Sequence, residues 1–313
     1  MNKQVATIDL GTNTFHLLIA ELDSEIFFRI VYRERIPVMI GRGGINQGII
    51  KEDAKQRALD ALSHFKEKLD TFGVLEDNVH CTATSAIRNA KNGQELVDSI
   101  FQKTGIRVDV ISGDKEAEYI YYGVRQAVPL GSKSALIMDI GGGSVEFIIC
   151  NQDEIHWKQS FEIGAQRLLD RFDIQDPITQ ANISDLNGYF NDRLAPLAEI
   201  VKEYQPNTLI GASGTFDTLS DIYVLESNLE VDKEATELPL SHDAFQRMLN
   251  AFSKKNREER LQIPGMIEMR VDMIVVASWL INYILEAYGL QEIRISSYAL
   301  KEGLLVQLAK QIQ

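Results

Sequence analysis

The chain of 313 residues is long enough for two domains of ordinary size. Its 45% hydrophobic and 25% charged residues are typical of a folded globular protein and exclude intrinsic disorder. With 32 basic and 45 acidic residues, the formal net charge is −13, which argues against non-specific nucleic-acid binding because that binding needs Lys and Arg to neutralise phosphates. A phosphate-rich ligand stays open, since a local positive pocket can lie within an acidic surface.

No segment of the sequence predicts export or membrane insertion. The N-terminus has no apolar segment followed by a cleavage site, and the most apolar stretch, 273–285, is far shorter than the ~20 residues of a membrane span. The two cysteines, Cys81 and Cys150, lack the spacing of zinc ligands and are expected to be small buried residues. We therefore expect a cytoplasmic protein.

The predicted elements alternate between strands and helices. In chain order, the first part predicts a strand–turn–strand unit at 6–20, a helix at 52–71, a strand and turn at 80–86, a helix at 94–104, a strand at 107–111 and a helix at 115–127. A turn-rich crossing leads to the second part, which predicts another strand–turn–strand unit at 136–150, helices at 165–172, 183–203, 214–225, 266–287 and 298–311, and short strands at 208–211 and 292–295. Such alternation is typical of an α/β protein.

The two strand–turn–strand units share one sequence frame. In each, an Asp between apolar residues is followed by an apolar residue, a glycine, two small residues and a Ser or Thr, and then by a further apolar run. Asp9 and Asp139 take matching places 130 residues apart, far more than the period of a solenoid, so the frame indicates two copies of one domain. The turns of such units can point backbone N–H groups at phosphate oxygens, and the Asp beside each turn can hold Mg²⁺.

Two further charged residues follow predicted strands. Arg88 lies in a polar turn and can clamp phosphate bidentately, although on its own it also fits a surface salt bridge. Glu116 falls in the first turn of a predicted helix: either it activates water as a general base, or Ser112 is simply an N-cap and Glu116 favours the helix dipole. His16 follows the first turn and either points into a cleft or packs as an ordinary strand histidine.

The order of these motifs resembles the exopolyphosphatase/guanosine pentaphosphate phosphohydrolase (Ppx/GppA) family of the actin-like superfamily. The Ser-Gly-x-x-Glu-Ala segment at 112–117 is the most specific element of the resemblance. The motifs that carry it cover essentially the whole chain and lie at 9–14, 84–90, 111–117, 139–146, 164–168, 211–215, 270–272 and 296–303.

The resemblance implies an α/β fold with two ribonuclease-H-like domains and the active site in the cleft between them. The first domain would comprise 1–125 plus 299–313, with the closing helix packed back onto it. The second domain would comprise 126–298. Members of the family also suggest a homodimer.

The resemblance also implies a role for each motif residue. Glu116 would be the base, Arg88 would neutralise the phosphate under attack, and Glu146 would orient water or metal. Asp9, Asp139 and Glu146 would organise Mg²⁺. The implied phosphate-binding residues are Gly11, Thr12, Asn13, Thr14, Gly141, Gly142, Gly143, Ser144 and Gly214.

The sequence departs from the family pattern in several places. Lys301 stands where Arg is usual, and Ala212 and Ser213 replace part of a glycine run that contacts nucleoside in nucleotide-binding relatives. Arg42, in a loosely matching loop, either lines the cleft or faces solvent. The additional helical C-terminal region of long members is absent here, so we expect poorer handling of long chains.

The sequence therefore favours a Mg²⁺-dependent phosphohydrolase that removes terminal phosphate from inorganic polyphosphate. Removal of the 5′ γ-phosphate of guanosine pentaphosphate is the alternative, made less favourable by Ala212 and Ser213. A non-enzymatic actin-like scaffold would not need Glu116, and a small-metabolite kinase would need a catalytic Asp for which the first domain offers no convincing candidate. Neither nucleic acid nor a membrane is an expected partner.

Overall fold

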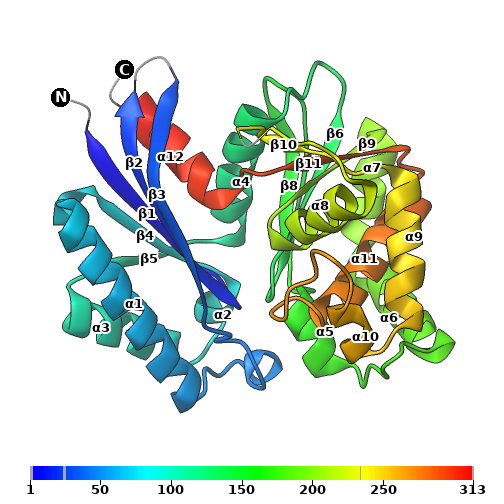
Figure 1. The fold of residues 1–313 in the computed structure, drawn as a ribbon, viewed down its shortest axis with the longest axis horizontal. Coiled ribbons are helices and arrows are strands. Elements are labelled where there is room, and N and C mark those ends of the chain that lie inside the picture. Colours follow the sequence, from blue (N-terminus) through cyan, green and yellow to red (C-terminus); the bar gives the residue numbers. More distant parts are fainter. Residues whose placement is uncertain (1–2, 24–25, 233, 312–313) are drawn as a thin grey trace.

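The computed structural model describes residues 3–23, 26–232 and 234–311 and places two β-sheets next to each other (Figure 1). The first sheet has the order β3-β2-β1-β4-β5 and the second has β10-β11-β9-β6-β7-β8. The strands of the first sheet are β1 (Gln4–Leu10), β2 (Thr14–Asp23), β3 (Phe27–Pro37), β4 (Val79–Ala83) and β5 (Val108–Val110). Those of the second are β6 (Ala135–Ile140), β7 (Val145–Cys150), β8 (Ile155–Phe161), β9 (Thr208–Ala212), β10 (Glu237–Leu238) and β11 (Glu292–Ser296).

The two sheets repeat one topology, as the shared sequence frame predicts. Strands β1, β2 and β3 form an antiparallel meander, which β4, parallel to β1, and β5, parallel to β4, extend. In the same way, β6, β7 and β8 form a meander, and β9 and β11 extend it in parallel. Asp9 pairs with His16 and Asp139 pairs with Glu146, so the two strand–turn–strand units have equivalent registers.

Helices cover both sheets, which confirms the predicted α/β class. Helices α1 and α3 lie together on the first sheet, where Leu62, Phe65 and Ile100 are fully buried. The α-helices are α1 (Glu52–Phe72), α2 (Ser85–Arg88), α3 (Gly93–Thr104), α4 (Gly113–Ala127), α5 (Ala165–Arg171), α6 (Gln180–Arg193), α7 (Ala195–Tyr204), α8 (Gly214–Ser227), α9 (His242–Lys254), α10 (Arg257–Leu261), α11 (Met273–Tyr288) and α12 (Leu300–Lys310). Short 3₁₀ turns occur at η1 (Ile45–Gln47) and η2 (Glu76–Asn78). None of the described helices is long and apolar enough to cross a membrane.

Helices α4 and α12 lie side by side between the two sheets (Figure 1). The buried face of α4 packs on the second sheet, for example Ile120 with Ile137. The buried face of α12 packs on the first sheet, for example Leu305 with Leu18. Helix α4, which follows the strands of the first sheet in the chain, thus joins the core of the second sheet. Helix α12, which follows the strands of the second sheet, joins the core of the first. The division into 1–125 plus 299–313 and 126–298 stays a prediction.

Two glycines allow α4 and α12 to approach backbone to backbone. A Cβ on Gly303 would overlap the carbonyl oxygen of Tyr119, and a Cβ on Gly123 would overlap that of Ala299. Neither position has room for a side chain, so the pair fixes how closely the helices cross.

The substitution Gly303→Ala is therefore expected to lower the free energy of unfolding by about 1–3 kcal/mol, because the added methyl group overpacks this crossing. Urea unfolding followed by circular dichroism measures the change. Gly188→Ala is the matched control, since Gly188 lies within α6 with no atom within 4 Å of its added Cβ. That control should raise stability by about 0.5–1 kcal/mol through helix propensity, and equal effects of the two changes would contradict the steric explanation.

Several predicted elements were wrong in their extent. The single helix expected at 183–203 is two helices, α6 and α7, because Pro196 lies in the first turn of α7, where a missing N–H is tolerated. The helix expected at 266–287 begins only at Met273, and turns occupy the preceding residues, where the Arg260 guanidinium donates to the Val271 carbonyl at 3.1 Å. Strands β3 and β8 and helix α9 were not predicted.

Candidate active site

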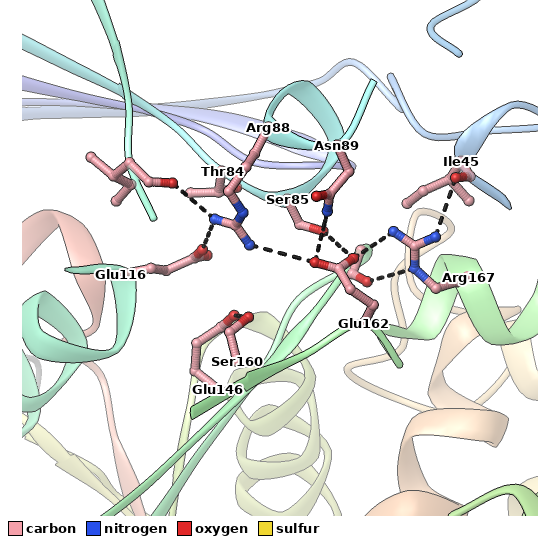
Figure 2. Close-up of polar contacts among 12 residues, drawn as sticks. Ile45, Thr84, Ser85, Arg88, Asn89, Glu116, Glu146, Ser160, Glu162 and Arg167 are labelled. Atoms are coloured by element: carbon pink, nitrogen blue, oxygen red, sulfur yellow. Dashed lines mark hydrogen bonds and ion pairs between the residues drawn. The ribbon is translucent and has the colours of Figure 1, made fainter. Parts of the chain in front are cut away.

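A cleft between the two sheets collects the predicted site residues at one place. The turns of both strand–turn–strand units face it, as do the start of α4 and the start of α8. The predicted residues that line it are Asp9, Gly11, Thr12, Asn13, Thr14, Glu116, Asp139, Gly141, Gly142, Gly143, Ser144, Glu146 and Gly214. Arg88 is not among the lining residues, but it contacts Glu116, which is (Figure 2).

The two glycine turns meet each other across the cleft. A Cβ on Gly142 would overlap the Asn13 side chain, and one on Gly143 would lie 2.6 Å from the Ser85 hydroxyl oxygen. Within the described residues, the N–H groups of Gly142 and Gly143 have no hydrogen-bond acceptor, whereas the N–H of Gly141 donates to the carbonyl of Ser144 at 3.0 Å. Glycine is therefore required here for close approach, and it leaves N–H groups available to an anion.

Buried carboxylates surround the cleft. Burial raises the pKa of Asp9 to about 7, an effect that the Asp139 charge increases and the Lys301 charge opposes. Burial likewise raises the pKa of Asp139 to about 6 and that of Glu146 to about 8. The Ser213 hydroxyl donates to Asp139 at 2.7 Å, which favours the charged form. Such a group of acids attracts protons or cations into the site.

Glu116 and Arg88 form a mostly buried ion pair beside these acids (Figure 2). Arg88 Nη1 donates to Glu116 Oε2 at 2.8 Å and to the Ile111 carbonyl at 3.1 Å. The Arg88 side chain is only 17% exposed. The surface salt bridge that its sequence position also allowed is therefore not what the structure shows. Burial first, and then the Glu146 charge, raises the pKa of Glu116 well above its usual value, while Arg88 lowers it.

The N-terminus of α4 presents Glu116 to the cleft. The Ser112 hydroxyl accepts a hydrogen bond from the Lys115 N–H at 3.2 Å, so Ser112 is the N-cap. Glu116 is 93% buried and lines the cleft, so its place is not explained by the helix dipole alone. The N-cap expected at Ser112 is therefore confirmed, and the role of Glu116 as a general base stays a prediction.

Further cleft residues lacked an assigned site role in the sequence analysis. His16 points into the cleft, and burial lowers its pKa well below the usual value, which keeps it neutral. Arg270 lies against Gly214, where a Cβ would overlap its guanidinium, and Asp217 lies near Arg270 and Lys301. The motif at 270–272 signalled Arg270, whereas no pattern signalled Asp217, whose burial raises its pKa.

A second groove continues from the cleft through Arg35, which lines both. Arg42 is exposed and lines this outer groove rather than the cleft itself. Of the two alternatives considered for Arg42, exposure to solvent is the correct one.

The acids and neighbouring oxygens of the cleft include possible ligands for a hard cation. The buried oxygens Asp9 Oδ1, Asn13 Oδ1 and Thr14 Oγ1 have no hydrogen-bond partner. Across residues 3–23, 26–232 and 234–311, no three or more His, Cys, Asp or Glu side chains come together as a metal-binding group. This donor set fits Mg²⁺, which usually takes one or two carboxylates and completes its shell with water and substrate phosphate.

Comparison with protein families matches residues 18–312 to the Ppx/GppA phosphatase family. The chain belongs to this family. It is similar to the crystal structure of an exopolyphosphatase from Cytophaga hutchinsonii, with 43% identity, a TM-score of 0.94 and 99% of both chains covered. A bifunctional 3-dehydroquinate synthase/phosphatase of Fusobacterium nucleatum is 31% identical over 91% of this chain and 43% of its own length. A guanosine-5′-triphosphate,3′-diphosphate pyrophosphatase of Vibrio cholerae is 28% identical over 98% of this chain and 60% of its own length.

The chain thus spans less than two thirds of these two curated relatives. Membership of the Ppx/GppA phosphatase family confirms the resemblance drawn from the motifs and the predicted fold class. It also confirms the prediction of a hydrolase over that of a non-enzymatic scaffold.

Proposed function

We propose that this protein is a divalent-metal-dependent phosphohydrolase that releases terminal orthophosphate from inorganic polyphosphate. The observation that carries the proposal is the Glu116–Arg88 pair, in which Glu116 lines the cleft together with the two glycine turns. A carboxylate for water activation and a guanidinium for phosphate charge are thereby held 2.8 Å apart. Phosphoryl transfer depends mainly on such positioning and charge stabilisation.

In this proposal Glu116 accepts the proton of the attacking water, and Arg88 neutralises charge on the phosphate under attack. Glu146 orients the water, with the Ser160 hydroxyl donating to its carboxylate at 2.6 Å. The N–H groups of Gly142 and Gly143, in the turn between β6 and β7, bind oxygens of the substrate phosphate.

Asp9, Asp139 and Glu146 are the residues that would hold Mg²⁺ in this proposal, with water and substrate phosphate completing its shell, since in the described part of the chain they do not converge as a direct three-carboxylate group. The unpartnered Asp9 Oδ1 supports it, because a buried carboxylate oxygen without a hydrogen bond costs free energy that a cation would offset. When bound, the cation would supply positive charge to the phosphate oxygens.

The second glycine-rich turn supports polyphosphate over guanosine pentaphosphate as the substrate. Ala212 is fully buried in β9, and the hydroxyl of Ser213, which lines the cleft, is already donated to Asp139. The two glycine turns, by contrast, both line the cleft. We further infer that the protein acts in the cytoplasm.

The substrate assignment is tested by phosphate release from long polyphosphate, short polyphosphate, guanosine pentaphosphate and ATP, each with Mg²⁺ and with excess EDTA. We expect the highest kcat/KM on polyphosphate and no release with EDTA. A higher kcat/KM on guanosine pentaphosphate would overturn the choice of substrate. No release from any of the four would overturn the hydrolase proposal, and release unaffected by EDTA would overturn the metal requirement.

A further inference from the structure

One carboxylate outside the proposed chemistry receives hydrogen bonds from both sides of the cleft. Glu162 Oε2 accepts from the Ser85 hydroxyl at 2.9 Å and from Arg167 Nη2 at 2.5 Å. Its Oε1 accepts from the Asn89 amide at 2.7 Å and lies 3.7 Å from Arg88 Nη2. Figure 2 shows these groups converging on Glu162. Its carboxylate is thus engaged through both oxygens.

The partners of Glu162 come from opposite sheets. Glu162 itself follows β8 on the second sheet, whereas Ser85 and Asn89 belong to α2 and its C-cap, directly after β4 of the first sheet. Arg167, on α5, also donates to the Gly143 carbonyl at 3.0 Å and to the Ile45 carbonyl at 3.2 Å. These contacts require the two sides of the cleft to be together, as they are in this structure.

The guanidinium of Arg88 lies between two carboxylates. Its Nη1 contacts Glu116, and its Nη2 faces Glu162. A guanidinium is planar, so contacts at both ends fix its orientation as well as its place. Without Glu162, the Nη2 end would have no carboxylate among the contacts in the described part of the chain, and the plane could rotate away from Glu116.

We propose that Glu162 is a positioning residue: it holds Arg88 in the orientation that keeps Nη1 on Glu116, and it does so only when the two sides of the cleft meet. The inference rests on the proposed function of Arg88 and Glu116. Glu162 acts through Arg88, because its own negative charge repels phosphate and its oxygens are already engaged.

The first test is Glu162→Gln, which keeps the shape of the side chain and removes its charge. We expect kcat on polyphosphate to fall about tenfold with KM changed less than about twofold. The reason is that the orientation of Arg88 set by Glu162 affects the reacting state more than it affects substrate binding. Asp170→Asn is the matched control: Asp170 also bridges the cleft, accepting from the Gly43 N–H at 2.9 Å, but it is not among the residues that contact Arg88 in the described part of the chain. An equal fall in kcat for the control would show that Glu162 only holds the sides together and would overturn the proposal.

The second test is a double-mutant cycle with Arg88→Ala. If Glu162 acts through Arg88, Glu162→Gln changes kcat by less than about twofold in the Arg88→Ala background. The same tenfold loss in both backgrounds, or no loss in wild-type background, would overturn the proposal.

A third measurement separates this inference from the proposed function. The ¹⁵N-resolved side-chain signals of Arg88 report hindered rotation of its guanidinium without any substrate. We expect slow rotation in the wild-type protein and fast rotation in Glu162→Gln. If the wild-type protein releases no phosphate, the proposed function fails, and the rotation of the Arg88 guanidinium alone tests the positioning role of Glu162. Equal rotation rates in the wild-type protein and in Glu162→Gln would overturn that role.

Discussion

Replacing Glu116 by Gln is expected to lower kcat for phosphate release by roughly 10²–10⁴-fold, the usual contribution of a general base. The amide matches the carboxylate in size and can still accept from Arg88 Nη1, but it cannot take a proton from water. The loss should therefore appear in kcat, with substrate binding largely kept. Steady-state phosphate release and calorimetric titration with polyphosphate measure the two quantities separately.

Glu118→Gln is the matched control for that substitution. Glu118 lies on the same helix but outside the cleft, near Lys115 at 3.3 Å and Lys158 at 3.6 Å. Its neutralisation should leave kcat unchanged. A Glu116→Gln variant that keeps most of its activity would show that another group activates the water.

The burial of Glu116 also sets the expected pH dependence. Burial and the Glu146 charge raise the pKa of Glu116 well above its usual value. A base acts only in its deprotonated form, so activity should be lost as pH falls through that raised pKa, at a higher pH than for a solvent-exposed glutamate.

The parts of the site that could be predicted from sequence depend on local backbone chemistry. The frames around Asp9 and Asp139 need a strand end, a glycine and small residues within a few positions, and the structure forms equivalent turns from both. The same holds for the Ser112 cap that places Glu116 at the start of α4. Each of these features is determined by residues close together in the chain.

The parts that could not be predicted depend on distant contacts. Strand β3 carries several charged residues among its apolar ones, so it gives no clear two-residue alternation although it extends the first sheet. The role of Glu162 depends on Ser85 and Arg88, which are more than 70 residues away in sequence. Asp217 likewise enters the cleft because β9 directs the start of α8 there, a consequence of strand order that no local pattern contains.

Replacing Arg88 by Met is expected to lower kcat by about 10²–10³-fold, the scale for removing one donor that stabilises transition-state charge. The acidic limb of the pH profile should also move to higher pH, because Arg88 is the residue that lowers the pKa of Glu116. Arg88→Lys should recover only part of the activity, since one ammonium group cannot contact Glu116 and Glu162 in the geometry of a guanidinium. Measuring kcat across pH tests both effects together.

The control for Arg88 is Arg294→Met, which breaks another close arginine–carboxylate pair. Arg294 contacts both oxygens of Glu237 at 2.7 Å, on β11 and away from the cleft lining. Its loss should leave kcat and the pH profile unchanged. If Arg88→Met lowered kcat without moving the acidic limb, Arg88 would contact phosphate but would not control the protonation of Glu116. A shift of that limb to lower pH would contradict the assigned electrostatics, because removing a neighbouring cation can only disfavour the carboxylate form of the base.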